Sequence, residues 1–223
     1  DPGHPANRER DGAHRDAICD LYRRADDLVG RTLARLGPRD VLLVVSDHGF
    51  KTFQRGVNLN AWLRERGWLR LRGDAESGPP PPLPAGAARE TSEIDWSRTR
   101  AYASGLAGLY VNLSGRERGG IVPPAEAGAL KAQIIAGLKE LRDPLRENAR
   151  VVNEAWDAEA IYRGPYRENA PDVVVGYNAG WRAGWDSAVG RTTALVLEDN
   201  TRAWSGDHCI DPRLVPGVLF ASR

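Results

Sequence analysis

The feature that most constrains the fold of this chain is a continuous apolar run at residues 41–45, VLLVV. The run is short, rich in β-branched side chains and preceded by Gly37 and Pro38, a pair that ends a helix. These properties are typical of a strand buried on both faces, as in a parallel sheet. Before it, apolar residues recur at three- and four-residue steps over residues 13–36, which predicts an amphipathic helix. A helix followed by a buried strand is half of an α/β repeat.

Other segments extend this pattern along the chain. Residues 172–175 and 217–220 are apolar runs that predict two more buried strands. Helices are predicted over residues 58–66 and from the proline pair at residues 123–124, which can open a helix. We therefore predict an α/β fold, in which a mostly parallel sheet flanked by helices is interrupted by a smaller inserted α+β module.

Composition divides the chain into four segments. Residues 1–72 carry the first helix and strand of the α/β core, and residues 171–223 return to that core. Residues 73–94 are rich in Pro, Gly and Ala, which is typical of a linker. Residues 95–170 contain short predicted strands and a helix, and we expect them to form an inserted, cap-like region.

Charge and composition argue against several classes of protein. The chain has 223 residues and a net charge of +1, so no overall field favours nucleic acid or a membrane surface as partner. No apolar run approaches the ~20 residues of a membrane span. Cys19 and Cys209 lack CxxC spacing, which favours two free thiols in a reducing compartment such as the cytoplasm. The chain begins at Asp1 and contains no Met, so we expect its natural start to lie upstream.

The segment Ser46-Asp47-His48-Gly49 directly follows the first predicted strand. Functional groups gather at the carboxyl ends of strands in open α/β sheets. A carboxylate beside an imidazole suits a divalent ion such as zinc or manganese, and Gly49 allows a tight turn there. The alternative is an ordinary Asp-His turn with a solvated imidazole, because short motifs often match by chance. Ser46 is interpreted as a structural hydroxyl.

A further candidate ligand, His208, lies in the sequence WSGDHC, in a loop before the last predicted strand. Asp207 could orient its imidazole through a hydrogen bond, or could simply be a turn residue. Taken alone, a histidine in such a loop is more often a surface residue than a ligand. His14, at the start of a polar helix face, is interpreted as exposed to solvent.

Taken together, these segments resemble one known family. Residues 41–69, VLLVVSDHGFKTFQRGVNLNAWLRERGWL, are similar to the second metal segment of the type I phosphodiesterase/nucleotide pyrophosphatase family, in the alkaline phosphatase superfamily. The tail WSGDHCIDPRLVPGVLF resembles its last metal-histidine segment. The segments TRAYASGLAGLYVNLSGRERGGIV and YRGPYRENAPDVVVGY are also similar to family members, and the opening DPGHP resembles the stretch after the first metal pair. The resemblance covers nearly the whole chain, as the C-terminal half of such a protein.

The resemblance implies a site for two divalent metal ions, zinc or manganese. Asp47 and His48 match ligands of the ion that binds the nucleophile, and His208 matches a ligand of the ion that helps to hold the phosphate. The Thr or Ser nucleophile of the family and its N-terminal ligands have no counterpart here, so we expect them upstream of Asp1. Asp1 and His4 have the wrong spacing for that missing pair and are interpreted as a loop. An incomplete ligand set predicts weak metal binding and little turnover by the isolated chain.

The predicted function is metal-dependent hydrolysis of a phosphate ester or nucleotide by the complete protein. Its implied partners are a small-molecule substrate and the missing N-terminal half. Two alternatives stay open: a non-catalytic or degenerate α/β module, and a member of the phosphomutase or sulfatase branch of the superfamily. A metal-free nucleotide-binding domain is disfavoured, because neither GxGxxG nor a P-loop sequence follows a predicted strand.

Overall fold

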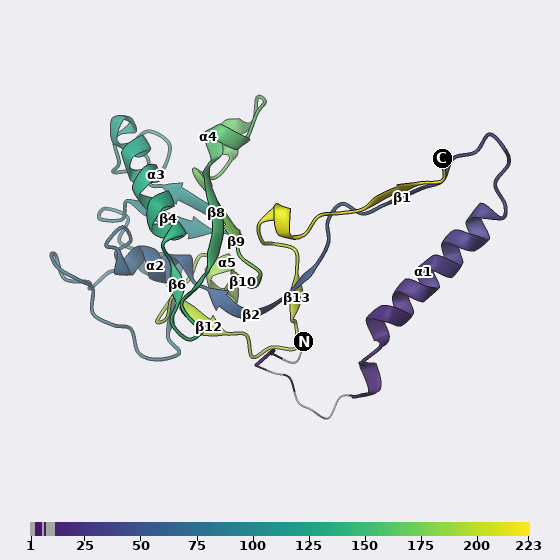
Figure 1. Ribbon diagram of the computed structural model, residues 1–223. Coiled ribbons are helices and arrows are strands. Elements are labelled where there is room, and N and C mark those ends of the chain that lie inside the picture. Colours follow the sequence, from purple (N-terminus) through teal and green to yellow (C-terminus); the bar gives the residue numbers. More distant parts are fainter. Residues whose placement is uncertain (1–2, 6, 8–11) are drawn as a thin grey trace.

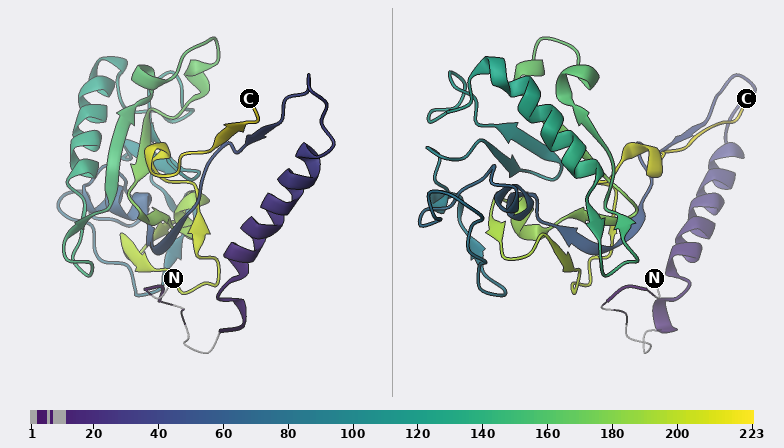
Figure 2. Two further views of the ribbon diagram at one scale, coloured as in Figure 1. Left: turned by 45° about the vertical axis from the view of Figure 1, so that its right-hand side comes forward. Right: turned by 60° about the vertical axis from the view of Figure 1, so that its left-hand side comes forward.

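Two segments far apart in the sequence leave the body of the fold and form a projecting arm (Figure 1). They are helix α1 (Ala17–Leu33) and a ribbon made of strands β1 (Leu43–Val45) and β14 (Leu219–Ala221). The arm stands apart from the body in two further views (Figure 2). The computed structural model describes residues 3–5, 7 and 12–223, so Asp1 lies outside the described residues. No helix in this described part combines the length and apolarity needed to cross a bilayer.

The core of the body is an antiparallel sheet packed against helices. Its strands lie in the order β4, β5, β9 and β8 and span Ala101–Ser104, Gly108–Val111, Val173–Tyr177 and Val152–Asp157. Helix α3 (Pro124–Lys139) packs against β8 and β5, and helix α2 (Leu59–Glu65) packs against β4. The two helices predicted in this region are confirmed, as is the buried strand β9. Burial of each large apolar side chain stabilises the fold by about 1.5–3 kcal/mol.

A second sheet is built around β2 (Lys51–Val57). Strand β10 (Gly180–Ala183) pairs with β2 in parallel, whereas β12 (Leu197–Asp199) and β13 (Gly206–Asp207) pair with it antiparallel. Among the named strands of the described residues, β2 and β10 form the one parallel pair. The mixed α/β class is confirmed, but the prediction of a mostly parallel sheet is wrong. Neighbours such as β4 and β5 are joined by short loops, and only antiparallel strands can be connected that way.

The remaining elements are short. Strands β3 and β11 pair with each other, β6 and β7 form a hairpin, and α4 and α5 are short helices; they span Ala88–Arg89, Thr192–Thr193, Arg142–Asp143, Ala149–Arg150, Ala158–Ile161 and Trp185–Ala188. Within the described residues, the 3₁₀ helices η1 to η4 span Gly12–His14, Thr91–Glu93, Arg167–Asn169 and Pro212–Leu214. The Pro- and Gly-rich stretch after residue 73 runs against α2, where Arg64 donates to the Asp74 carboxylate and to the Pro81 carbonyl.

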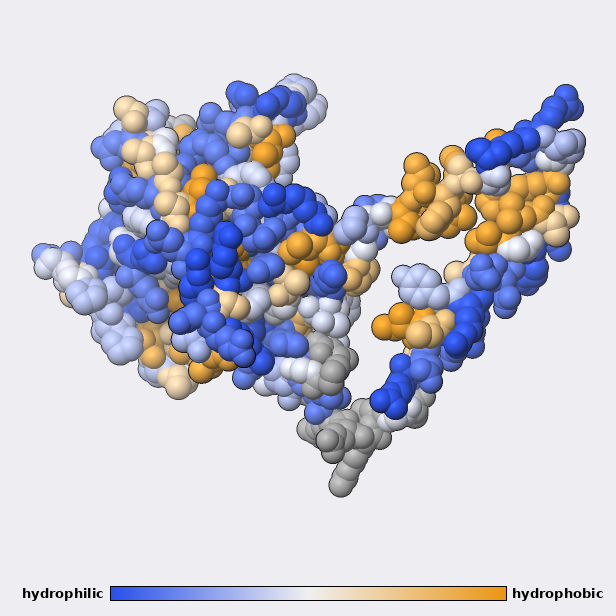
Figure 3. Space-filling view, in the orientation of Figure 1, coloured by the Kyte–Doolittle hydropathy of each residue, from blue (hydrophilic) through white to orange (hydrophobic). Residues whose placement is uncertain are grey.

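The arm exposes the residues that the sequence pattern places in buried strands. Strands β1 and β14 do form, but Val45 and Leu219 are 65% and 70% exposed. The predicted burial of residues 41–45 and 217–220 is therefore wrong within the described chain, because no other strand pairs with this ribbon there. Helix α1 is confirmed, yet it too has no buried residue. Figure 3 shows the resulting apolar face of the arm, which comprises Ile18, Leu21, Tyr22, Leu28, Leu33, Val41, Leu43, Val45, Val218, Leu219 and Phe220.

A buried ion pair joins β2 to the β6–β7 hairpin. Arg55 donates from Nε to Asp143 Oδ2 at 2.7 Å and from Nη1 to Asp199 Oδ1 at 2.7 Å. The indole of Trp181 also donates to Asp143 Oδ2, at 3.0 Å. Burial acts to raise the pKa of Asp143, but hydrogen bonds from Arg55 and Trp181 outweigh it and hold the pKa below its usual range. The carboxylate is therefore ionised and paired at neutral pH.

Replacement of Asp143 by Ala should destabilise the fold by about 3–5 kcal/mol, because it removes one partner of a buried ion pair. The pKa of Asp143 is lowered in the folded state, so its contribution is present above the unfolded pKa of about 3.9 and is lost as pH falls further. Urea unfolding at pH 7 and near pH 3 measures both effects. The control is Asp199→Ala, which removes the half-exposed partner of Arg55 and should cost about 1 kcal/mol or less. Equal losses in the two variants would contradict this account.

Candidate metal centre

Two histidines that are distant in sequence meet where the arm joins the body. The antiparallel pairing of β13 with β2 places Asp207 opposite Lys51 and Gly206 opposite Thr52. One step beyond this ladder, His208 therefore lies beside the loop that precedes β2. The rings of His48 and His208 stack with their centroids 3.7 Å apart and their planes 5° from parallel. Phe50 contacts both imidazoles, at 5.4 Å from each centroid.

The loop that carries His48 is also tied to the chain after His208. The amide of Gly49 donates to the Val215 carbonyl, and the amide of Ser46 donates to the Val218 carbonyl, both at 2.9 Å. The Ser46 hydroxyl accepts a hydrogen bond from the Val218 amide at 2.9 Å, a contact that fits a structural hydroxyl. A Cβ on Gly49 would lie 2.9 Å from the Pro216 carbonyl oxygen. This close approach explains the need for glycine after the Asp-His pair.

Asp47 and His48 present two donor atoms to the same space. Asp47 is 88% exposed, and its Oδ2 lies 3.6 Å from His48 Nε2. His48 Nδ1 lies 3.0 Å from the Gly49 carbonyl oxygen, so a hydrogen bond there leaves the lone pair on Nε2. Two ligands of one zinc ion, each about 2.0 Å from the metal, lie about 3.3 Å apart in tetrahedral geometry. The pair therefore fits ligation of one divalent ion.

Around His208, the neighbouring residues Asp207 and Cys209 complete a cluster whose candidate ligand atoms lie within 4.8 Å of one another. Asp207 is buried, and its Oδ1 accepts from the amides of His208 and Cys209 at 2.7 and 2.9 Å. Its Oδ2 pairs with Arg182 Nη1 at 2.7 Å. Burial acts to raise the pKa of Asp207, but these hydrogen bonds and Arg182 keep it below its usual range. Asp207 is thus a fixed anion that positions the loop.

Cys209, predicted from the sequence only to be a free thiol, is a further candidate metal ligand. It is unpaired, and its Sγ lies 3.9 Å from His208 Nε2. Burial raises the pKa of the thiol to about 11, and the adjacent Asp207 adds to this effect. Its position directly after Asp207 and His208 in WSGDHC is the sequence signal that points to it as a candidate ligand. Arg182 had no such signal, because only the fold brings β10 to Asp207.

The family of the chain is established by comparison with known proteins. The sequence model of the family described as Type I phosphodiesterase / nucleotide pyrophosphatase matches residues 7–205. The chain belongs to this family. Comparison with curated proteins and with solved structures gave no match. Membership indicates a phosphoester hydrolase that acts on a small-molecule phosphoester or nucleotide, and such enzymes are typically metal-dependent.

The other histidines of this phosphodiesterase-family chain lie in different surroundings. His4 is buried, and its Nε2 lies 3.0 Å from the Asn200 amide nitrogen. Burial lowers the pKa of His4, so a neutral imidazole is favoured. His14 is exposed on η1, as predicted. Of the candidate ligands, the structure thus brings His48 and His208 together, with Asp47 beside them.

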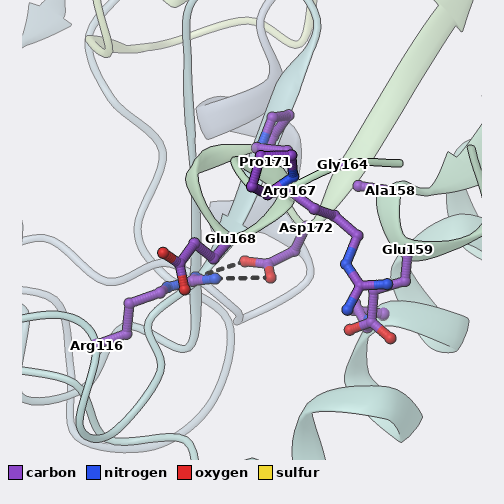
Figure 4. Close-up of a pocket in the computed structure, with 11 residues that line it drawn as sticks. Arg116, Ala158, Glu159, Gly164, Arg167, Glu168, Pro171 and Asp172 are labelled. Atoms are coloured by element: carbon purple, nitrogen blue, oxygen red, sulfur yellow. Dashed lines mark hydrogen bonds and ion pairs between the residues drawn. The ribbon is translucent and has the colours of Figure 1, made fainter. Parts of the chain in front are cut away.

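A charged cavity of about 310 Å³ lies elsewhere on the phosphodiesterase-family fold, beside η3 and α4 (Figure 4). Arg116 donates twice to Asp172 there, at 2.9 and 2.6 Å. Lys131 pairs with Glu159 at 3.1 Å. The cationic side chains in its lining are matched by equal numbers of carboxylates, so the cavity has no excess positive charge with which to hold a phosphate.

Replacement of Gly217 by Ala should loosen the His48 loop, because the new Cβ would lie 2.2 Å from the Ser46 carbonyl oxygen. The Ser46 and Gly49 amides should then exchange with solvent about tenfold faster or more, since local opening becomes easier. Hydrogen exchange followed by NMR measures this. The control is Gly206→Ala in β13, whose Cβ would meet no atom closer than 3.8 Å. Unchanged protection in the Gly217 variant would mean that the contact does not hold the loop.

Proposed function

We propose that this chain supplies ligands to the two-metal centre of a phosphoester hydrolase. Asp47 and His48 would hold the ion that binds the nucleophile, and His208 would hold the ion that helps to bind the phosphate. The observation that carries this proposal is the stacking of the two imidazoles at 3.7 Å. Ions in two-metal sites lie about 3.5–4 Å apart, so parallel rings at this spacing can each direct a nitrogen to one ion.

The surroundings of these side chains fit zinc or manganese ligation. The Gly49 carbonyl fixes the orientation of His48, and Asp207, at 3.7 Å from His208 Nδ1, lies where it can orient that ring. The contact with Gly49 leaves Nε2 of His48 for a metal, and Nε2 of His208 lies 3.9 Å from the Cys209 Sγ, a further donor atom. The chemistry that bound divalent ions would supply is Lewis-acid polarisation of a phosphoryl group. Asp47 adds an exposed carboxylate, which can ligate an ion without first breaking an ion pair to Arg or Lys.

The nucleophile and the remaining ligands are proposed to come from a segment before Asp1. The Ser46 hydroxyl in the Asp-His loop accepts from the Val218 amide at the root of the ribbon, a backbone contact that supports a structural role for it. The apolar face of the arm supports this proposal. Helix α1 and the faces of the two-stranded β1–β14 ribbon present apolar side chains to solvent, and large exposed apolar surfaces of this kind mark sites where further chain packs.

In the complete protein, His208→Ala should lower phosphoester hydrolysis at least about 100-fold, because it removes a proposed metal ligand. Initial rates with p-nitrophenyl phosphate and bis-p-nitrophenyl phosphate, each with zinc and with manganese, measure the loss. They also distinguish monoesterase from diesterase activity. His14→Ala, an exposed histidine far from either metal loop in sequence, is the matched control and should retain full activity. A fully active His208 variant would remove His208 from the site. A complete protein inactive on both substrates with either metal would favour the non-catalytic alternative.

The 223-residue chain alone should bind zinc with a dissociation constant above about 1 µM. A complete structural site binds zinc with a free energy of about 10–16 kcal/mol, and the ligand set of this chain is incomplete. Competition with a zinc chelator measures the affinity. Asp47→Asn and His208→Ala should each weaken the residual binding, whereas His14→Ala should not. Tight, stoichiometric binding by the chain alone would show that its own residues complete the site.

A further inference from the structure

A cavity lies on the inserted region, between the segment before β4 and the turn after β5. Its volume is about 530 Å³, within the range of small-molecule sites. It is lined by Trp96, Tyr102, Asn112, Glu117, Arg118 and Gly119. The proposed metal centre does not use these residues.

The walls of this cavity are built by specific contacts. Trp96 meets Tyr102 edge-on, with ring centroids 5.1 Å apart, and Tyr110 stacks on Tyr102 at 5.3 Å. The buried amide of Asn112 donates to the Trp96 carbonyl at 3.0 Å and to the Gly119 carbonyl at 3.3 Å. One side chain therefore fixes both walls, so the cavity is a defined feature of the fold.

The polar groups at the cavity differ in what they can still bind. The Glu117 carboxylate already has partners within the protein, since it accepts from the Leu113 amide at 2.8 Å and pairs with Arg116 at 2.8 Å. Arg118 is exposed and has no ion pair or hydrogen bond to any described residue. The Trp96 indole N–H and the Tyr102 hydroxyl also lack partners in the described chain. The groups that remain available to a ligand are thus one cation, Arg118, and two neutral hydrogen-bond donors, on Trp96 and Tyr102, beside aromatic rings.

The cavity lies away from the histidine pair. Asp172, directly before β9, binds Arg116 in the turn that forms one wall of the cavity. At the other end of β9, the Tyr177 carbonyl accepts from the amide of Asp211, in the loop after His208. The strand between them has 5 residues, which corresponds to about 16 Å. A molecule in the cavity would therefore not occupy the proposed metal centre.

We propose that this cavity binds a planar aromatic compound that carries an anionic substituent. The ring would lie against Trp96 and Tyr102, where offset and edge-on contacts between aromatic systems are favourable. The anionic group would pair with Arg118, whose planar guanidinium suits carboxylate, sulfonate or phosphate oxygens. The Trp96 N–H and Tyr102 O–H can donate to the same group or to a ring substituent.

The test uses naphthalene-2-sulfonate, a planar aromatic anion that contains no phosphoester and so is no substrate for the proposed hydrolase. Binding is followed by NMR through the indole N–H signal of Trp96, which is assigned with Trp96→Phe. The signal should shift saturably below about 2 mM probe. Arg118→Gln should weaken binding about tenfold, because a charge-assisted hydrogen bond is lost. Arg167→Gln, which changes an exposed arginine of the charged cavity, is the matched control and should leave the dissociation constant unchanged.

Two further ligands separate the contributions of ring and charge. Naphthalene-2-methanol, which lacks the charge, should bind about tenfold more weakly than the sulfonate and should be insensitive to Arg118→Gln. Methanesulfonate, which lacks the ring, should leave the Trp96 signal unmoved at the same concentrations. The proposal is overturned by an unmoved Trp96 signal with the aromatic sulfonate, by equal affinity for the neutral compound, or by equal effects of the two arginine variants. Arg118 is at the surface, and unchanged spectra elsewhere verify that its variant is folded.

Discussion

Pairing between β13 and the first residues of β2 decides where the two histidine loops lie. An antiparallel ladder places the residues that flank it side by side, so the register of Asp207 with Lys51 leaves His208 near His48. Arg182 secures this register. Its guanidinium pairs with buried Asp207 at 2.7 Å and lies over the ring of Trp185 at 4.5 Å. Loss of either charge would leave its partner buried and unpaired, a cost that holds the loop in one position.

The same loops connect the candidate site to the arm. Ser46 and Val218 exchange hydrogen bonds at the root of the β1–β14 ribbon, immediately before Asp47. A two-stranded ribbon is marginally stable in water by itself, and this one exposes Val45 and Leu219. Whatever covers the apolar face of the arm would therefore also fix the orientation of the Asp47–His48 loop. Under the proposed function, a segment that pairs with this ribbon would be well placed to supply the remaining ligands.

Local pattern was sufficient for much of the fold. The positions of α1, α2, α3 and β9 follow from apolar periodicity, Pro at the start of α3 and Gly after α2, because these are signals within one element. Strand direction and burial depend on partners that are distant in sequence. The VLLVV run predicts a buried strand because apolar residues avoid water, but the sequence pattern does not show whether the residues that cover it belong to the same segment of chain. Likewise, the choice of His48 and His208 came from family resemblance, and their contact depends on a ladder that no single segment encodes.

The two Asp-His pairs, Asp47–His48 and Asp207–His208, have the same side chains but different surroundings. Asp47 is almost fully exposed, and its carboxylate has no Arg or Lys partner among the described residues. A metal ion can therefore bind this carboxylate without displacing a basic side chain. Asp207 is buried, accepts from two backbone amides and is neutralised by Arg182. To ligate a metal, it would have to give up these bonds and leave the buried guanidinium unpaired, which costs several kcal/mol. The same dipeptide therefore offers an exposed carboxylate in one loop and an anchor in the other, and His208 depends on the anchor for its place.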